Sequence, residues 1–499
     1  MTDATPRLAA RTLSGAAWLM AARLGTRMID FVGLLLLANL LLPADFGMIA
    51  VALTLVQIVE AIFEIPVVQV LVRSEAITRT LLDTAFTVGL LRGAALSLTL
   101  ALLAYPFTIL YHDPRLLPLI CFLSSAPVLR GIASPAMAHF ARAIDFRRDL
   151  LIEVLGKLFA LGCSVPLAIL THSYWALAAG TVAGPAAMMA LSFGFAPYRP
   201  RLSLAEWPVF SHFVGWMTAA QTVGALNWQI DRLLLARFVS KAELGSFSLA
   251  GDLAAVPEQA LIKPTGRPLL SAFAALRGDM DRLRFAYSRV VTMLLAGCLP
   301  VVLGLSLLAE PVVRFALGPK WQASWPMLQW LVLTLIPVLL TAPLGSLAMA
   351  LGRTEATLQR NLAELAIKLP LAIAGVWYFG TYGLIAARMI SGVAMIFVCG
   401  WMVRRLIQMP ARDQFRSIWR PACAGLAMTL ALVALRPQLH AVGGLWLGIG
   451  LATCSATALL VYAGVLFALW HGSGRPQGIE TIVAGQITAR LARRATSLR

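Results

Sequence analysis

Charged residues are scarce in this sequence. They make up 13% of its 499 residues, against about 25% in a typical soluble domain. Arg92 is the one charge in residues 84–110, and residues 158–195, 290–309 and 443–470 contain none. An apolar run of about 20 residues is long enough to cross a bilayer as a helix. The scarcity of charge therefore predicts an all-α integral membrane protein.

Several motifs that would indicate an enzyme are also missing. The six cysteines include no CxxC pair, so they read as small buried apolar residues and not as a disulfide or metal framework. No GxxxxGK[ST] sequence is present, which argues against direct use of ATP. We expect no catalytic residue, no metal and no cofactor. The first apolar segment contains Arg23 and Arg27 and is too long for a cleavable signal peptide.

Hydropathy predicts about fourteen membrane spans. We place them at residues 13–41, 47–71, 84–110, 116–138, 150–170, 174–195, 208–236, 244–272, 287–309, 323–351, 361–379, 383–403, 418–435 and 443–470. With this arrangement, twenty-five Lys and Arg lie on one side of the membrane and six on the other. Cytoplasmic loops carry the excess of basic residues, so both termini are expected in the cytoplasm. The same topology accounts for the net charge of +18 without a nucleic-acid partner.

The loops on the opposite side are short, the longest being about 310–322. They leave no room for the large outer loop that a membrane glycan polymerase or ligase typically needs.

An internal repeat appears when the sequence is shifted by 198 residues. Leu37–Pro66 then falls on Leu235–Pro264, with eight identities in thirty positions, among them Gly47 on Gly245. Parallel repeats of this kind are typical of transporters whose site lies between two lobes near the membrane midplane.

A second similarity links the two halves. An i,i+4 Glu–Lys pair opens the fifth span, Glu153–Lys157, and another opens the eleventh, Glu364–Lys368. Spans 1–6 and 7–12 therefore read as two copies of a six-helix unit. The predicted parts are an N-terminal lobe (1–196), a cytoplasmic linker (197–207), a C-terminal lobe (208–405), two extra spans (406–470) and a basic cytoplasmic tail (471–499).

Charged side chains remain inside the predicted spans, where each costs about 2.5–3.5 kcal/mol at a helix centre. The basic ones are Arg23, Arg27, Arg92, Arg130, Lys157, Arg232, Lys263, Arg267, Lys368 and Arg388. The acidic ones are Asp30, Glu60, Glu64, Glu153, Asp231, Asp252, Glu258 and Glu364. Such residues persist only when they pair with each other or face a wet cavity.

The spacing of these charges favours a cavity. Arg23, Arg27 and Asp30 share one helix face. Asp252, Lys263 and Arg267 lie along another. Pro66, Pro264 and Pro268 can break or bend the charged spans.

A chamber rich in guanidinium groups suits a phosphate or pyrophosphate. We therefore predict one group of residues that binds substrate and another that balances charge or couples to H⁺ or Na⁺. The substrate-binding residues are Arg23, Arg27, Arg92, Lys263, Arg267 and Arg388. The coupling or balancing residues are Asp30, Glu60, Glu64, Asp252 and Glu258.

Other charges have structural interpretations. Glu153–Lys157, Glu364–Lys368 and Asp231–Arg232 fit pairs that hold helices together. Arg130 and Arg388 lie near predicted span ends, where long side chains can reach the interface.

Six segments in order resemble the Wzx-type oligosaccharide flippases of the multidrug/oligosaccharidyl-lipid/polysaccharide exporter superfamily. They are LANLLLPADFGMIA (37–50), FARAIDFRRDLLIE (140–153), SYWALAAG (173–180), NWQIDRLLLARF (227–238), LGPKWQASWPMLQWL (317–331) and ALGRTEATLQRN (350–361). The sequence departs from the family pattern at Asn39, where an Arg is common, and at Glu64–Pro66, where the acid is usually followed shortly by Gly.

The resemblance implies two six-helix bundles arranged in a V, with two extra helices. It implies a protein of the bacterial inner membrane that moves an undecaprenyl-pyrophosphate-linked oligosaccharide across it by alternating access during surface polysaccharide biosynthesis. Expected partners are the lipid-linked oligosaccharide, the bilayer, and a polysaccharide polymerase and glycosyltransferases of the same pathway. A cation-coupled drug exporter of the same superfamily is the closest alternative, and a membrane polymerase or ligase is another. The glycan, the coupling ion and the oligomeric state are left open.

Overall fold

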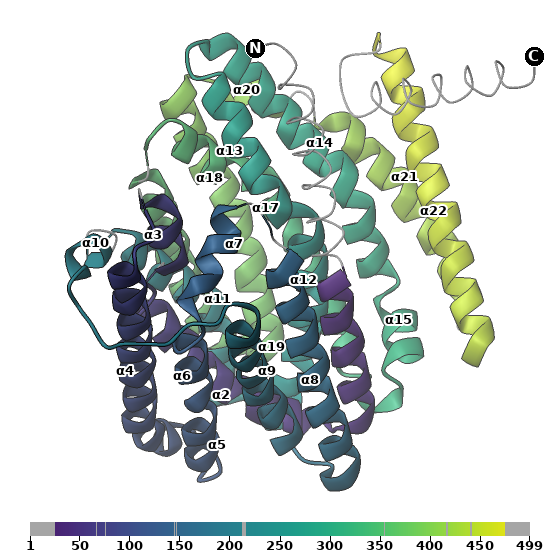
Figure 1. Ribbon diagram of the computed structural model, residues 1–499. Helices are drawn as coiled ribbons and strands as arrows, with labels where there is room; N and C mark the ends of the chain where they lie inside the picture. The colour runs from purple at the N-terminus through teal and green to yellow at the C-terminus, as the bar shows by residue number, and fades with distance from the viewer. Residues whose placement is uncertain are drawn as a thin grey trace, which may run out of the picture. The chain divides into compact units, whose positions relative to one another are not determined.

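Helices form the described structure, which is a computed structural model (Figure 1). It describes residues 25–474 except 66, 75, 144, 146, 212–215, 354, 416–417 and 440–441. Nine helices in these ranges are long and apolar enough to cross a membrane, or ten if one bent pair is a single span. The all-α membrane fold is thus confirmed, and the number fourteen stays a prediction. Polar residues such as Asn227 and Asp231 lower the hydropathy of the predicted span 208–236. Other predicted spans are broken into shorter helices.

The chain folds into two compact units, Met1–Ser248 and Leu249–Arg499. The first contains a helix over residues 25–40, α2 (Pro43–Ile62), α3 (Val67–Arg73), α4 (Arg79–Tyr111), α5 (Leu116–Leu123), α6 (Ser125–Gly131), η1 (Pro135–Met137), α7 (Ala138–Arg142), α8 (Arg147–Thr171), α9 (Trp175–Phe195), α10 (Trp207–Ser211), α11 (Trp216–Phe238) and the start of α12 (Lys241–Pro257). Helix α8 packs along α9, α4 against α5 and α6, and α11 along α2. The division falls beyond the predicted linker at 197–207 because α11 packs on α2. The lobes as assigned from the sequence stay a prediction.

The second unit continues from α12. Its elements are η2 (Glu258–Ile262), η3 (Lys263–Thr265), α13 (Gly266–Ala275), α14 (Met280–Leu307), α15 (Ala309–Ala316), η4 (Pro319–Trp321), α16 (Ser324–Leu333), α17 (Leu335–Thr341), α18 (Pro343–Ala350), α19 (Glu355–Ile407), α20 (Ala411–Phe415), α21 (Trp419–Leu435), η5 (Arg436–Leu439) and α22 (Gly444–Gly472). A core with Phe273, Tyr287, Leu347 and Met402 joins α13, α14, α18 and α19.

The start of α2 follows from its first residues. Pro43 stands at the beginning of the helix, where its missing N–H costs nothing. Asp45 accepts a hydrogen bond from the N–H of Leu42 at 3.1 Å through one carboxylate oxygen. Its other oxygen accepts from the N–H of Tyr174 at 3.1 Å. The Asp45 carboxylate therefore accepts hydrogen bonds from backbone N–H groups at the beginning of both α2 and α9, which lack partners within their helices.

The repeat-related glycines Gly47 and Gly245 lie against each other in the first unit. A Cβ on Gly47 would meet the carbonyl of Lys241 and the backbone of Gly245. A Cβ on Gly245 would meet the carbonyl of Pro43 and the backbone of Gly47. Positions 43 and 47 of the first copy correspond to positions 241 and 245 of the second, 198 residues later. The contact is therefore symmetric, because each glycine meets the equivalent residues of the other copy. The match found in the sequence is a physical crossing of α2 and α12 that only glycine permits.

Two of the predicted spans contain breaks that their residues explain. The span at 244–272 is interrupted by the π-helical turn η2 and the 3-10 turn η3. Pro264 lies within η3 and Pro257 just before η2, and a proline removes a helical hydrogen bond. Helix α19 is two arms joined at Gly380, whose φ of 58° and ψ of −138° favour glycine. Its arms correspond to the predicted spans 361–379 and 383–403.

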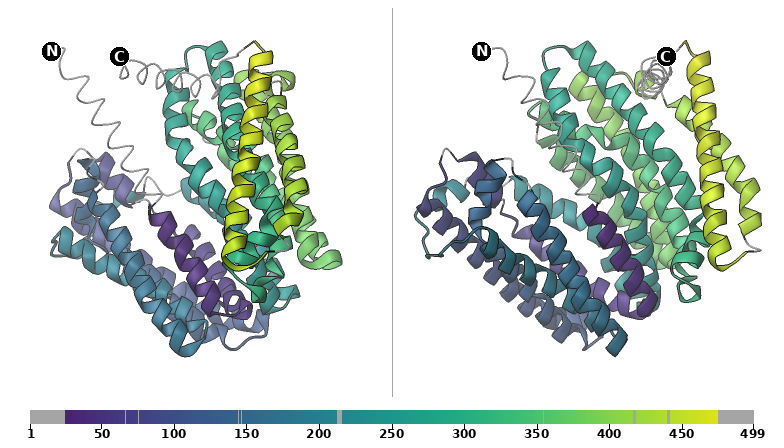
Figure 2. Two further views of the ribbon diagram at one scale, coloured as in Figure 1. Left: turned by 90° about the vertical axis from the view of Figure 1, so that its right-hand side faces the viewer. Right: turned by 45° about the vertical axis from the view of Figure 1, so that its right-hand side comes forward.

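Apolar side chains cover the outer faces of the helices. On α22, which lies beside α21 at the edge of the second unit (Figure 2), Leu445 is 77% exposed and Leu460 is 73% exposed. On α8 in the first unit, Phe159 and Ile169 are exposed. Water would not favour apolar faces this large, whereas hydrocarbon does. The helices thus have the surface of a protein embedded in a bilayer.

Candidate functional site

Two arginines bind the C-terminal end of α2. Arg92 on α4 donates from Nε to the carbonyl oxygen of Phe63 at 2.7 Å and from a terminal nitrogen to Glu64 Oε2 at 3.1 Å. Arg130 on α6 pairs with Glu60. The last carbonyls of a helix lack partners within it and carry partial negative charge, so cations are favourable there. We call Glu60, Glu64, Arg92 and Arg130 the α2-end cluster. It is formally neutral.

The sequence predicted Arg92 as a substrate ligand and suggested that Arg130 reaches the interface. In the structure each arginine has a carboxylate partner on α2 or just beyond its end. The side chain of Arg92 is 24% exposed, and that of Glu64 is 43% exposed. The roles of these residues in transport stay predictions.

Lys157 joins α8 to the helix over residues 25–40. Its Nζ lies 2.8 Å from Asp30 Oδ2 and 3.0 Å from Glu153 Oε1, and it donates to the carbonyl of Thr26 at 3.4 Å. Arg27 lies 3.7 Å from Asp30 and its side chain is 53% exposed. The pair Glu153–Lys157 read from the sequence is therefore part of a larger group, which we call the Lys157 cluster: Arg27, Asp30, Glu153 and Lys157. Arg27 has the most exposed side chain among the members of the two clusters. Arg23, predicted beside it, lies outside the described residues.

A row of amides connects α2 to α11. Gln229, 1% exposed, donates to Gln57, and Thr54 donates to Gln229 at 3.4 Å. Asn227 and Asp231 are also buried on α11. The predicted site omitted Gln229, although the polar run NWQIDR inside a predicted span was a usable signal. These hydrogen bonds fix α11 against α2 in the first unit.

The remaining predicted residues lie in the second unit. Glu258 on η2 lies 3.8 Å from Lys263 on η3, whose side chain is 56% exposed. Arg267 in the first turn of α13 and Asp252 on α12 are exposed. Arg388 is half-buried on α19. The break in the helix therefore displays Lys263 on a 3-10 turn, shortly before Arg267 at the start of α13. That these cations and those of the first unit line one chamber stays a prediction.

The predicted linker is bound to the first unit through α4. Tyr198 donates to the carboxylate of Asp83, and the N–H of Ser203 donates to Thr87 Oγ1 at 2.9 Å. Burial, and then the hydrogen bond to Asp83, raise the pKa of Tyr198 above its ordinary value. The segment after α9 is thus held in place by side chains of α4.

In the described ranges, no three His, Cys, Asp or Glu residues lie close enough together to bind a metal ion. The charged groups instead form salt bridges and expose arginine and lysine, which suits the binding of an anion.

Comparison with known proteins finds similar sequences and a similar fold. The model of the family described as "polysaccharide biosynthesis protein" matches residues 36–326. The lipopolysaccharide biosynthesis protein WzxC of Escherichia coli is 26% identical over 437 residues, which cover 85% of this chain and 87% of the relative. The succinoglycan biosynthesis transport protein ExoT of Rhizobium meliloti is 26% identical over 336 residues, covering 66% and 67%.

Among solved structures, the lipid II flippase MurJ in an inward closed conformation has a similar fold. The TM-score is 0.72 at 13% identity, covering 92% of this chain and 100% of that one.

Proposed function

The chain belongs to the polysaccharide biosynthesis protein family, and we propose that it carries a lipid-linked oligosaccharide across the bacterial inner membrane. The lipid is undecaprenyl pyrophosphate, moved from the cytoplasmic to the periplasmic leaflet. Support comes from the family match over residues 36–326 and from relatives named for lipopolysaccharide biosynthesis and succinoglycan transport. The fold shared with MurJ is that of a membrane transporter.

The observation that carries the proposal is a pair of exposed cations inside the predicted membrane spans. The side chains of Arg27 and Lys263 are 53% and 56% exposed. Side chains this exposed can present N–H donors to a ligand. The pyrophosphate is the charged part of the substrate, and guanidinium and ammonium groups bind phosphate oxygens well. The isoprenoid tail stays in the bilayer.

The transport cycle that we propose uses alternating access with no nucleotide. Arg23, Arg27, Lys263 and Arg267 hold the pyrophosphate, and Arg92 and Arg388 complete the cationic lining. The acids Asp30, Glu60, Glu64, Asp252 and Glu258 balance these charges. A gradient of H⁺ or Na⁺, or the membrane potential, supplies the drive, with Glu60, Glu64 and Glu258 as the candidate coupling acids.

The proposal can be tested in cells that lack the gene. They should accumulate the lipid-linked oligosaccharide in the cytoplasmic leaflet, and the wild-type gene should restore export of the polysaccharide. Arg27→Gln should fail to restore export at normal protein levels. Arg115→Gln is the matched control, because Arg115 is a 68% exposed arginine in a turn outside the predicted spans. Full export with Arg27→Gln would refute the assignment of Arg27.

The two alternatives predict other outcomes. A drug exporter would give marked drug resistance in a hypersusceptible strain without restoring polysaccharide. A polymerase or ligase would transfer sugar in a purified reaction. We expect neither result, because the relatives are named for polysaccharide synthesis and because the predicted spans contain ten basic residues, which suit an anion better than a cationic drug.

A further inference from the structure

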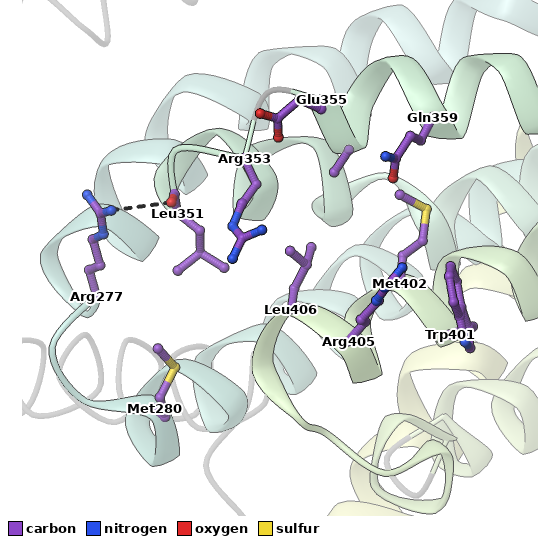
Figure 3. A pocket seen from close by; sticks show the side chains of 11 residues that line it. Arg277, Met280, Leu351, Arg353, Glu355, Gln359, Trp401, Met402, Arg405 and Leu406 are labelled. Carbon is purple, nitrogen blue, oxygen red and sulfur yellow. Dashed lines mark hydrogen bonds between the residues drawn. The ribbon is translucent and has the colours of Figure 1, made fainter.

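The second unit contains a cavity of about 630 Å³ at one end. Three separate segments line it: the turn between α13 and α14, the turn between α18 and α19, and the last turns of α19 (Figure 3). We call it the basic end pocket. These segments are among those whose arginines predict a cytoplasmic location, and the structure brings them together around a single space.

Three arginines line the basic end pocket, one from each segment: Arg277, Arg353 and Arg405. The pocket has one carboxylate, Glu355, so its lining has a formal charge of +2. In the described part of the chain, no carboxylate oxygen lies within the 4.0 Å salt-bridge distance of these three guanidinium groups. Among the residues that the structure describes, they thus differ from the arginines of the α2-end cluster, which have carboxylate partners.

The three guanidinium groups are positioned in different ways. Arg277 donates to the carbonyl of Leu351 at 3.3 Å, and Arg405 lies over the ring of Trp401 at 5.2 Å. Arg353 extends from the α18–α19 turn toward the space above Leu406 (Figure 3). A guanidinium group has five N–H donors, so Arg277 and Arg405 retain donors after these contacts. Each can therefore still donate to the oxygens of an anion in the pocket.

Gln359 adds one amide group, and the rest of the lining is apolar. Met280, Leu351, Met402 and Leu406 line the pocket beside the arginines, and Trp401 at its edge is 58% exposed. Tryptophan is common where membrane meets water. A ligand that uses both parts has a phosphate at one end and a hydrocarbon chain at the other.

We propose that the basic end pocket binds the phosphate group of an anionic lipid, separately from the chamber assigned to transport. The phosphate oxygens bind guanidinium groups of the lining, and the hydrocarbon chain lies along its apolar side chains. Two lipids carry this chemistry, a phospholipid such as phosphatidylglycerol and polyprenyl pyrophosphate itself.

The test is binding to the purified full-length protein, which does not depend on transport. The probes are phosphatidylglycerol, phosphatidylcholine, undecaprenyl pyrophosphate and inorganic pyrophosphate, each titrated against the protein in mild detergent and followed by native mass spectrometry. We expect at least one of the two anionic lipids to bind more tightly than phosphatidylcholine. Binding by phosphatidylglycerol alone assigns the pocket to phospholipid, and binding by undecaprenyl pyrophosphate alone assigns it to the transported class of lipid.

Substitutions then locate the site. Arg353→Gln and Arg405→Gln should each weaken anionic lipid binding about tenfold, since each removes charge-assisted hydrogen bonds. The control is Arg282→Gln, because Arg282 lies near the start of the same α14, is 77% exposed, and pairs with Asp279 outside the pocket. Equal losses in all three variants would mean general attraction to a basic surface and would overturn the proposal. So would unchanged binding in Arg353→Gln and Arg405→Gln, or inorganic pyrophosphate binding as tightly as the lipids.

Discussion

Arg92 and Glu64 form an ion pair in which the two partners should contribute unequally to stability. Replacing Arg92 with Gln removes both the ion pair and the hydrogen bond to the Phe63 carbonyl. Replacing Glu64 with Gln leaves the second of these contacts in place. A hydrogen bond to a charged group contributes roughly 1.5–3 kcal/mol, and a half-exposed ion pair contributes about 1 kcal/mol or less. We expect Arg92→Gln to cost about 2–4 kcal/mol and Glu64→Gln about 1 kcal/mol.

The assay is equilibrium unfolding of the purified protein by SDS in mixed micelles, with the double variant completing a mutant cycle. The coupling energy from the cycle should be about 1 kcal/mol or less, because other contacts of Glu64 are present in both Arg92 backgrounds and cancel. If Glu64→Gln cost as much as Arg92→Gln, the Phe63 carbonyl would not be the main partner, and our reading of the α2-end cluster would be wrong.

Two further predictions concern the helix crossing and the linker. Gly245→Ala should destabilise the protein by about 1–3 kcal/mol, although alanine favours helices by about 1 kcal/mol relative to glycine. Gly251→Ala, which has open space around the added Cβ, should be neutral or stabilising. Unfolding in SDS compares the two variants, and equal effects on stability would refute the close crossing of α2 and α12. Tyr198→Phe should free the linker and speed tryptic cleavage at Arg199 and Arg201 in inside-out vesicles. Because the pKa of Tyr198 is raised on folding, the contribution of its O–H to linker binding is full below the ordinary tyrosine pKa of about 10 and is lost as the pH rises through the folded value. Cleavage of the wild type should therefore accelerate only in that alkaline range, and rapid cleavage at pH 8 would contradict the contact.

Hydropathy and the internal repeat predicted much of the fold because both can be read directly from the order of the residues. The match of Gly47 with Gly245 pointed to residues that touch, and Pro264 marked a break in its span. Hydropathy predicted the two arms of α19, 361–379 and 383–403, which meet at Gly380. It is less informative where a predicted span is polar, as at Asn227 in α11.

The partners of the charges could not be predicted in the same way. Lys157 pairs with Asp30 across 127 positions, and Arg130 with Glu60 across 70. Such distances are set by which helices pack together, and no periodicity encodes them. The convergence of Arg277, Arg353 and Arg405 in the basic end pocket depends on three segments meeting in space, which the sequence does not encode locally.

The central claim is that exposed cations of this protein move a pyrophosphate-linked oligosaccharide across a bilayer. The most direct measurement uses purified protein in liposomes that contain undecaprenyl pyrophosphate carrying a fluorescent short oligosaccharide, with a membrane-impermeant quencher reporting the outer leaflet. Wild-type protein and Arg115→Gln should both bring to the outer leaflet the labelled lipid that stays protected from the quencher in empty liposomes. Arg27→Gln should slow this translocation about tenfold or more, since one charge-assisted hydrogen bond is worth roughly 1.5–3 kcal/mol. Translocation no faster than in empty liposomes under an imposed H⁺ or Na⁺ gradient, or an Arg27→Gln variant as fast as wild type, would contradict the account.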